Sequence, residues 1–490
     1  MNLIPLFIVL PLAAAFTIPM VSRKFIKFPD ILGNLTTLAL VFLSVSVIGK
    51  TGVYMIGGWR MPLGINMVLD GLSVLMLITI NIVAFASTLY SVDYMEMYTS
   101  KLRYYSLFLL MLAGMNGVIL TGDLFNLYVF LEIASIASYA LVGFGCEYDE
   151  LEASFKYLVL GIVASSFILF GIAVIYGAVG SLNMAQISEV IRQKGMNNAL
   201  LFAAALFLMG FGLKSAQVPF HAWLPDAHSS APAPISAMLS GVLIKTLGIY
   251  TIIRLVYNIF GVSESLSFIL MTMGTLSMVT GVLLALGQWD FKRLLAYHSI
   301  SQVGYVILGI GLGTPLGILG GLFHLINHSV FKSLLFLNAG SVEYATGTRQ
   351  MEEMGGLSEK MPVTGATSLI ASMSIAGVPP FNGFWSKLII IAACVQAGHP
   401  VLALLAVIAS ILTLSSFLKV QKYVFFEKLK EKWNAVREVP LLMCVSMVLL
   451  SVLCVFMGLL LVPAAWNSFL NPAVQVVLEG TGYAMRVLGK

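Results

Sequence analysis

The chain has 490 residues, of which 59% are hydrophobic and 10% are charged, and its mean hydropathy is +0.96. Soluble domains average about 45–50% apolar and about 25% charged residues, so this composition excludes soluble enzymes, disordered proteins and disulfide scaffolds. The net charge of +5 comes from basic residues scattered at the ends of apolar runs. It is not the clustered basic patch that a nucleic-acid partner requires.

About fourteen apolar runs, bounded by charges or by Gly and Pro turns, follow one another from residue 3 to residue 463. A helix needs about 20 apolar residues to cross a bilayer. The runs therefore predict an all-α polytopic membrane protein with about fourteen transmembrane helices. The run at 3–21 is interpreted as a first membrane helix rather than a signal peptide. The stretch 464–490 is too mixed to span and is expected to lie along a membrane surface.

The loop cations predict the orientation, because cytoplasmic loops carry an excess of Lys and Arg. Sixteen of these cations lie in the loops that follow odd-numbered apolar runs, and seven lie in the loops on the opposite side. We therefore expect the loops after odd-numbered runs to lie in the cytoplasm. Both termini are then expected outside the cell membrane. The sixteen are Arg23, Lys24, Lys27, Lys101, Arg103, Lys156, Lys292, Arg293, Arg349, Lys360, Lys419, Lys422, Lys428, Lys430, Lys432 and Arg437, and the seven are Lys50, Arg60, Arg192, Lys194, Arg254, Arg486 and Lys490.

Two runs are interrupted in the same way, by FGLKSAQVPFHAWLPDA at 211–227 and by IAGVPPFNGFWSKL at 375–388. Proline removes a backbone donor and breaks a helix, and broken backbone at membrane depth is tolerated only inside protein or beside a water-filled cavity. Paired breaks in two halves indicate internal repeats with a site near the midplane. The spacing of 161 residues between Pro219 and Pro380 fits two repeats of about five helices each.

Glu132 lies some ten residues into an apolar run, which is close to mid-bilayer at a rise of about 1.5 Å per residue. No other acidic residue is so placed. A charge there costs about 2.5–3.5 kcal/mol even on the lenient insertion scale, so it needs a function or a partner. The alternative is a neutral structural glutamate satisfied by a hydroxyl.

Four lysines also lie inside apolar runs. Lys214 precedes the first break, Lys245 lies mid-run, and Lys387 follows the second break. Lysine suits proton transfer because a moving counter-charge changes how readily it holds its proton. A single membrane lysine could instead extend its ammonium from a helix end to the interface, but three flanked by apolar residues favour a functional set.

Histidines extend this set. His324, His328 and the fourth lysine, Lys332, recur every four residues and so share one helical face, where they could relay protons or pack as a hydrogen-bonded core. An i,i+4 pair could also bind zinc, but no third ligand or HExxH pattern supports this. For His298 the sequence allows two roles, proton relay or packing in the core.

The first break carries titratable residues of its own. His221, Asp226 and His228 lie within or just after it, on the expected cytoplasmic side. They could gather protons at an entrance, or they could cap the next helix.

Cofactor motifs are missing from the sequence. It contains no GxxxxGK loop, no GxGxxG after a strand, no CxxCH and no CxxC pair among its four cysteines. We therefore expect no cofactor, no metal and no electron carrier in this chain.

Five segments together resemble one family. They are TGDLFNLYVFLEIASIASYAL, LKSAQVPFHAWLPDAHSSAPAPISAMLSGVLIKTLGIY, FKRLLAYHSISQVGY, HLINHSVFKSLLFL and IAGVPPFNGFWSK. They are similar to the antiporter-like, proton-conducting membrane subunits of Mrp-type sodium/proton antiporters, of respiratory complex I and of energy-converting hydrogenases. The resemblance spans about residues 70–425, and the length is most similar to the D subunit of the Mrp antiporter.

The resemblance implies a fold and a set of site residues. The fold would be two inverted five-helix repeats with flanking helices, divided as 1–103 (flanking helices), 104–257 (first repeat, broken near 214–226), 258–425 (second repeat, broken near 377–384) and 426–490 (a basic segment, the last span and a surface tail). Glu132 and Lys214 would form an ion pair, and Lys245, His324, His328 and Lys387 would match the eighth-, eleventh- and twelfth-helix positions.

These observations predict a proton-translocating subunit of a multisubunit complex in the cell membrane, most similar to a Mrp-type cation/proton antiporter and without enzymatic activity of its own. A proton would be taken up near Lys214, cross through Lys245, His328 and His324, and leave by Lys387. The expected partners are other subunits, protons and the bilayer, with the passage of Na⁺ left open. The alternatives are a proton-pumping subunit of a redox-driven complex, a free-standing solute/proton transporter and a membrane scaffold.

Overall fold

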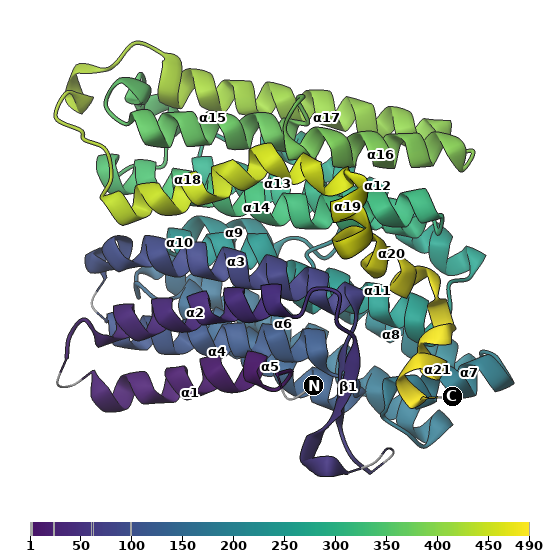
Figure 1. Cartoon of the computed structure of the whole chain (residues 1–490). Helices are drawn as coiled ribbons and strands as arrows, with labels where there is room; N and C mark the ends of the chain where they lie inside the picture. Colours follow the sequence, from purple (N-terminus) through teal and green to yellow (C-terminus); the bar gives the residue numbers. More distant parts are fainter. Residues whose placement is uncertain (1–2, 23–24, 60, 62, 99, 490) are drawn as a thin grey trace.

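The computed structural model describes residues 3–22, 25–59, 61, 63–98 and 100–489 of the chain. Long helices run side by side, and both termini lie at the same end of the bundle (Figure 1). We call this the terminal end, and we call the opposite end, which carries the connections 143–147, 347–361 and 427–440, the loop end. Arg23, Lys24, Arg60 and Lys490, four of the cations counted for the orientation, lie outside the described residues.

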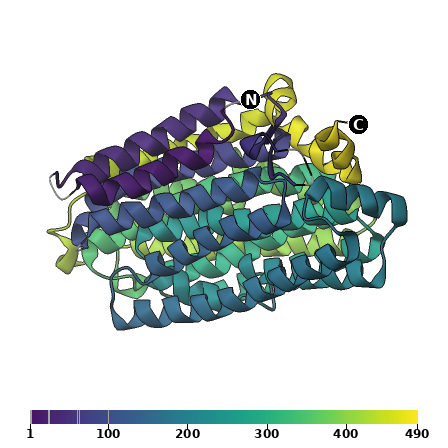
Figure 2. The same cartoon turned by 90° about the horizontal axis from the view of Figure 1, so that it is seen from below.

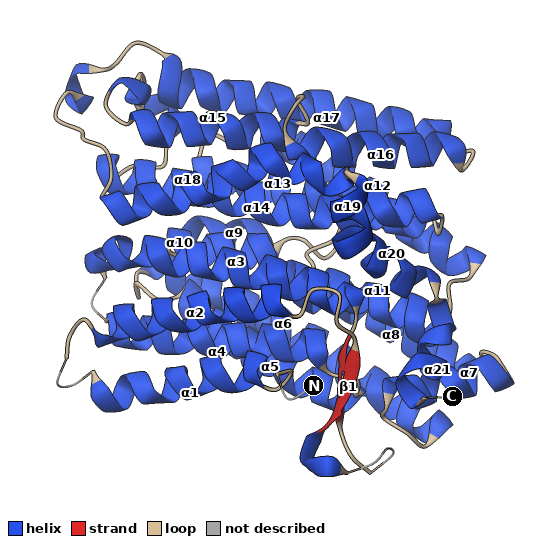
Figure 3. Ribbon diagram, viewed as in Figure 1, coloured by secondary structure: helices blue, strands red, loops and turns tan. Residues whose placement is uncertain are grey.

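Almost all of the described chain is helical (Figure 3). Eleven of its helices are long and apolar enough to cross a membrane, and three further apolar helices are shorter, which confirms the expected fold class. The count of about fourteen crossings stays a prediction. The α-helices are α1 (Leu6–Val21), α2 (Phe28–Ser46), α3 (Gly71–Tyr94), α4 (Lys101–Leu120), α5 (Leu124–Val142), α6 (Tyr148–Val179), α7 (Met184–Lys194), α8 (Asn198–Lys214), α9 (Trp223–Ser230), α10 (Ala233–Met238), α11 (Thr251–Ile253), α12 (Glu264–Leu286), α13 (Phe291–Gly311), α14 (Pro315–Thr346), α15 (Pro362–Ala376), α16 (Asn382–Gln396), α17 (Pro400–Val420), α18 (Leu441–Phe456), α19 (Pro463–Ala465), α20 (Asn471–Leu478) and α21 (Tyr483–Leu488).

Shorter helical turns of other types join these helices. The π-helical turns are η3 (Leu239–Leu243), η4 (Lys245–Tyr250), η5 (Arg254–Phe260), η8 (Gln421–Phe426) and η11 (Trp466–Leu470). The 3₁₀ turns are η1 (Ile56–Gly58), η2 (Met95–Met97), η6 (Met351–Glu353), η7 (Leu357–Glu359), η9 (Glu431–Trp433), η10 (Met457–Leu461) and η12 (Gly480–Gly482).

One β-hairpin departs from the expected all-helical architecture. Strand β1 (Gly52–Met55) pairs antiparallel with β2 (Asn66–Leu69), with Gly52 opposite Leu69 and Met55 opposite Asn66. It projects from the terminal end of the bundle, beside α1 and α2 (Figure 3). Seen from below, α1 and α2 lie along one side of the bundle, and both termini again lie at one end (Figure 2).

Both expected helix breaks are present. Helix α8 ends at Lys214 and α9 begins at Trp223, while α15 ends at Ala376 and α16 begins at Asn382. The two halves of the second break meet closely, because a Cβ on Gly383 would clash with the carbonyl oxygen of Ser374. Glycine is therefore required at this contact.

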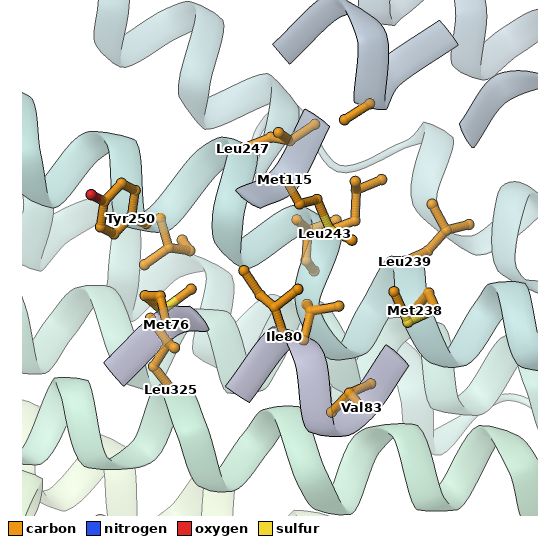
Figure 4. Packing of buried hydrophobic residues seen from close by; sticks show 14 of the residues in the cluster. Met76, Ile80, Val83, Met115, Met238, Leu239, Leu243, Leu247, Tyr250 and Leu325 are labelled. Carbon is orange, nitrogen blue, oxygen red and sulfur yellow. The ribbon is translucent and has the colours of Figure 1, made fainter. Parts of the chain in front are cut away.

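The helical segment 233–260, which we call the central helix, is buried along its whole length. It comprises α10, η3, η4, α11 and η5. Its apolar side chains pack against α3, α4 and α14 (Figure 4). In π-helical turns the hydrogen bonds run from i to i+5, and such turns are frequent at functional sites.

An ion-pair cluster fixes the central helix at the terminal end. The Asp70 carboxylate, which also caps α3, lies 2.6 Å from Arg254 and 3.2 Å from Arg486. Burial alone would raise the pKa of Asp70, but the two guanidinium groups hold it below its usual value. The C-terminal segment is thereby attached to α3 and to the central helix.

The predicted boundaries between repeats do not coincide with helix ends. The boundary at 103/104 falls inside α4, which begins at Lys101 because the Ser100 hydroxyl accepts a hydrogen bond from the backbone of Arg103. The boundaries at 257/258 and 425/426 fall inside the π-helical turns η5 and η8. Hydropathy marks the extent of an apolar run, whereas the helix end is set by local backbone hydrogen bonding, so the two differ by a few residues. The division into repeats itself stays a prediction.

Candidate functional site

Lys214 is the last residue of α8 and lies against α5. Its ammonium Nζ lies 3.8 Å from Oε1 of Glu132 and donates hydrogen bonds to Ser135 Oγ at 3.0 Å and to Tyr139 Oη at 3.1 Å. The chain break directly after Lys214 frees this residue to turn toward α5, as a broken helix at membrane depth allows. The structure therefore brings the two charges that the sequence singled out into one ion pair.

Glu132 differs from Lys214 in its exposure. The Lys214 side chain is 3% exposed, whereas the Glu132 side chain is 23% exposed and accepts a hydrogen bond from Ser165 of α6. Val129 and Ile136, one turn before and after Glu132, are 39% and 60% exposed. The carboxylate therefore lies on the outward-facing stripe of α5, at the edge of the buried site.

Lys245 is buried in the π-helical part of the central helix. Its Nζ donates to the carbonyl oxygens of Ser240 and, at 2.8 Å, of Gly241, both within its own helix. Ser240 Oγ in turn lies 2.6 Å from Ser299 Oγ of α13. Among the described residues no carboxylate lies within ion-pair distance of Lys245, and its hydrogen bonds go to backbone carbonyl oxygens of its own helix.

The predicted face of α14 exists and is completely buried. His324 and His328 stack with ring centroids 6.2 Å apart, and Lys332 follows one turn later with Nζ 5.5 Å from the Phe336 ring. His324 is held by Ser386 Oγ at 2.9 Å and Gln302 Oε1 at 3.1 Å. Within the described chain, both ring nitrogens of His328 and the ammonium of Lys332 are buried and have no hydrogen-bond partner among the protein's own groups.

Lys387 of α16 reaches back across the second break. Its Nζ donates to the carbonyl oxygen of Ile375 at 2.7 Å, near the end of α15, and to Ser410 Oγ at 3.3 Å. The ammonium also lies 4.9 Å from the centroid of the Tyr305 ring, which is 5.5 Å from the ring of His324. A cation at the C-terminus of a half-helix satisfies its unpaired carbonyls and interacts favourably with its dipole.

His298 lies beside this group rather than in it. Its Nε2 is 2.8 Å from Ser416 Oγ of α17 and its ring packs 4.8 Å from Phe417. The ring is buried, and both interpretations, relay and packing, stay open for it.

The structure separates the three residues expected at the first break. His221 lies half-buried between α8 and α9, whereas Asp226 lies inside α9 and pairs with Lys156 at 3.1 Å and Arg293 at 2.9 Å. His228 is fully buried near the end of α9. The capping interpretation was wrong, because the next helix, α10, is preceded by Pro232 and its N-cap position makes no side-chain hydrogen bond.

Sequence reasoning missed the neutral partners of these charges. Ser135 and Tyr139 follow Glu132 by three and seven residues, so helical periodicity could have placed them on its face of α5. Ser165 and Ser410 come from other helices, and no local signal could reveal them. In the described residues no three His, Cys, Asp or Glu side chains gather into a potential metal site.

Comparisons of this chain with known protein families and relatives identify the family to which it belongs. Residues 121–413 match the family described as "NADH:quinone oxidoreductase/Mrp antiporter, TM", and residues 56–105 match the family of the complex I chain 5 N-terminus. The N subunit of the NADH-quinone oxidoreductase of Desulforudis audaxviator is 34% identical over 447 residues, which cover 89% of each chain.

Two further matches are a named antiporter subunit and a chain of a Mrp complex. The D subunit of the Na⁺/H⁺ antiporter of Alkalihalophilus pseudofirmus is 35% identical over 432 residues, covering 86% of this chain and 87% of that protein. A chain of the Mrp complex from Dietzia sp. DQ12-45-1b superimposes with a TM-score of 0.92 at 28% identity, with both chains covered completely. The chain therefore belongs to the NADH:quinone oxidoreductase/Mrp antiporter family of membrane subunits.

Proposed function

We propose that this chain is the proton-translocating subunit of a multisubunit cation/proton antiporter of the Mrp type. The observation that carries this proposal is the ion pair of Glu132 with Lys214 at a broken helix, within a buried set of lysines and histidines. The relatives named as D subunits of Na⁺/H⁺ antiporters and the chain of the Mrp complex support the antiporter class. The chain acts in transport and not as an enzyme.

The proposed path follows the buried groups. A proton on Lys245 passes to His328 and His324 and leaves through Lys387 at the second break. Their contacts support the order from His328 to Lys387, since His324 contacts both His328 and the Tyr305 ring under Lys387. Among the described residues no hydrogen bond or ion pair connects Lys214 with Lys245, so we assign Lys214 to the gate.

The gate is the pair of Lys214 with Glu132. Moving a unit charge against 100 mV requires about 2.3 kcal/mol. Breaking a buried ion pair costs about 3–5 kcal/mol, so opening and closing one pair can control the passage of one charge. Because Glu132 lies on the outward-facing stripe of α5, a neighbouring subunit can act on it directly.

The proposed location is the cell membrane, with both termini on the outer side. The cations counted for the cytoplasmic side, such as Lys156, Arg293 and Arg349, lie at the loop end, and Lys50, Arg192 and Arg486 lie at the terminal end. Because cytoplasmic loops carry an excess of Lys and Arg, the larger number of cations at the loop end supports a cytoplasmic location for that end.

A second candidate is a proton-pumping subunit of a redox-driven complex. The match to the N subunit of the NADH-quinone oxidoreductase of Desulforudis audaxviator covers 89% of this chain, against 86% for the antiporter relative, which supports this interpretation. The chain would then hold no redox group itself, and the redox chemistry would lie in other subunits.

Purified complex in proteoliposomes separates the two candidates. We expect an imposed Na⁺ gradient to drive proton movement, reported by an entrapped pH dye, without any redox substrate. Proton movement that needs NADH or another reductant and ignores Na⁺ would favour the second candidate. Mass spectrometry of the co-purified subunits checks the same distinction independently.

A further inference from the structure

A polar cavity opens at the loop end of the bundle. It has a volume of about 390 Å³, and its lining includes Glu150, Lys292, Glu343 and Arg349. A second cavity of about 270 Å³ shares Arg349 with it. Carboxylates and cations both line these cavities, and polar cavities of this size are large enough to hold water.

One ion pair forms the inner wall of the first cavity. Lys292 Nζ lies 2.6 Å from Glu343 Oε2, and the second oxygen, Oε1, lies 3.8 Å from Arg349. The two members differ in exposure, because the Lys292 side chain is 2% exposed and that of Glu343 is 23% exposed. Glu343 therefore faces the cavity, and Lys292 faces the protein interior.

The floor of the cavity is the short connection between α9 and the central helix. Lys292 donates to the carbonyl oxygen of Ala231 at 3.2 Å, and Arg349 donates to that of Ser229. His228, the residue before Ser229, is fully buried, and within the described chain neither of its ring nitrogens has a hydrogen-bond partner. The charges of Lys332, Lys245 and Lys292 all act on this ring.

The contacts continue inward from His228. Its ring lies 4.8 Å from the Phe336 ring, and the ammonium of Lys332 lies 5.5 Å from the same ring. Lys332 is one helical turn from His328 on α14. From the backbone carbonyls that Lys292 and Arg349 contact beside His228, the buried groups His228 and Lys332, both next to Phe336, lead toward the histidines of the proposed path.

We propose that Glu343 and Lys292 form the proton-uptake gate of this subunit, and that His228 passes the proton on to the buried lysines. This proposal rests on the proposed function and specifies where the proton enters the subunit. It moves the uptake point from the neighbourhood of Lys214 to the cavity at the loop end, and it leaves the Glu132–Lys214 pair as a separate gate.

The proton count of the step is balanced. A proton from the cavity binds the Glu343 carboxylate, which leaves the Lys292 ammonium buried without a counter-charge. Such an unpaired buried cation is costly, so Lys292 releases its proton to the free lone pair of a His228 ring nitrogen through water. Glu343 then transfers its own proton to the neutral Lys292 amine and the ion pair returns. One proton has moved inward, and no co-reactant is consumed.

The test compares relay with a purely structural ion pair. Lys292→Arg keeps the cation and its carboxylate partner, but a guanidinium cannot release a proton in a protein. We expect K292R to lower proton transport by the intact complex by about a hundredfold or more, the scale of losing one positioned proton-transfer group, with assembly unchanged. His228→Gln should have an effect of the same size, because glutamine bonds to water but does not titrate.

Lys156→Arg is the matched control. Lys156 lines the second cavity, and its side chain is 47% exposed and paired with Glu152 and Asp226, so K156R should transport within about twofold of the wild type. Glu343→Asp, which keeps a titrating carboxylate, should retain more transport than Glu343→Gln.

The outcomes distinguish the two proposals. Full transport by K292R and H228Q, alongside loss in Glu132→Gln, would overturn the uptake gate and leave the proposed function standing. Full transport by all of these variants would overturn both. Loss in K292R and H228Q with normal transport in K156R supports the gate, provided that subunit content by immunoblot matches the wild type.

Discussion

Tyr139 and Tyr305 each lie under the ammonium of a lysine that adjoins a helix break. The ammonium of Lys214 lies 5.7 Å from the centroid of the Tyr139 ring, and that of Lys387 lies 4.9 Å from the centroid of the Tyr305 ring. Each lysine borders a helix break, and each tyrosine lies on a continuous helix, α5 or α13. Cation–π contacts of this kind are worth about 2 kcal/mol or more when desolvated.

The similarity extends along both helices. Glu132 precedes Tyr139 by seven residues, and His298 precedes Tyr305 by the same distance. The first half therefore pairs its lysine with a carboxylate, while the second half has a histidine at the matching position. This correspondence supports the proposed division into two repeats, and it places a carboxylate beside the break lysine Lys214 and a histidine at the matching position in the second half.

The central ion pair gives the first prediction. Glu132→Gln or Lys214→Ala should abolish ion transport by the assembled complex, because each removes one charge of the gate. Dye-based transport in vesicles checks this, with immunoblots to show that the subunit is inserted. Ser166→Ala is the control, because this exposed hydroxyl bonds only within α6 next to Ser165. Normal rates in both charge variants would remove the pair from the mechanism.

The second prediction concerns transport by the isolated chain. The chain expressed alone in vesicles should show no sustained antiport, because one proton path has no energy input of its own. Robust Na⁺-dependent proton exchange by the isolated chain would instead identify a free-standing antiporter. The control is the complete complex in vesicles of the same lipid composition.

The third prediction separates relay from structure at Lys387. Lys387→Arg keeps donors for the carbonyl oxygens at the break but cannot release a proton near neutral pH, so it should block transport nearly as fully as Lys387→Ala. Lys387→Glu should be milder, because its carboxyl can still titrate. If Lys387 only caps α15, the order reverses and arginine is tolerated while glutamate is not. Proton uptake at matched expression decides between these orders.

The fourth prediction uses the close approach beside Lys214. A Cβ on Gly248 would clash with the Cβ of Ser215, the residue directly after Lys214. Gly248→Ala should therefore destabilise the protein by about 1–3 kcal/mol, as overpacking does, and lower transport by displacing the break. Gly287→Ala is the matched control, because its Cβ would meet no atom within 4 Å. Thermal unfolding in detergent measures both variants.

The fifth prediction concerns Asp70. Its pKa is lowered in the folded state, so its ion pairs stabilise the protein above the unfolded pKa of about 3.9 and are lost as the pH falls through the folded value. Asp70→Asn should lower the free energy of unfolding by about 3–5 kcal/mol at neutral pH, since it leaves Arg254 buried and unpaired. The deficit should shrink below about pH 4. Glu264→Gln, at an exposed helix start, should have no such effect.

Local residue chemistry in the sequence was enough to predict the helix breaks and the buried lysines. Prolines in apolar runs placed both breaks, since Pro219 and Pro380 fall in the gaps between α8 and α9 and between α15 and α16. Lysines inside apolar runs marked the candidate site for the same reason, because each is costly unless its surroundings compensate it. The hairpin at 52–69 escaped prediction, because four-residue strands leave too few positions for an alternating pattern.

Partners from distant helices could not be predicted. Lys292 looked like an ordinary loop cation that helps to set orientation, and only the fold places it, buried, against Glu343 of α14. The carbonyl partners of Lys387 belong to the end of another half-helix, so no spacing along α16 reveals them. Burial and long-range pairing depend on tertiary packing, which a single sequence does not encode as a local pattern.

The exposure of Glu132 has a consequence for biogenesis. In a copy of the subunit that has not met its neighbours, this carboxyl borders acyl chains, since the flanking residues Val129 and Ile136 are exposed too. A charge at that depth costs about 2.5–3.5 kcal/mol. A neighbouring subunit that covers this stripe of α5 removes that cost, so the polar group at Glu132 favours the assembled over the isolated subunit.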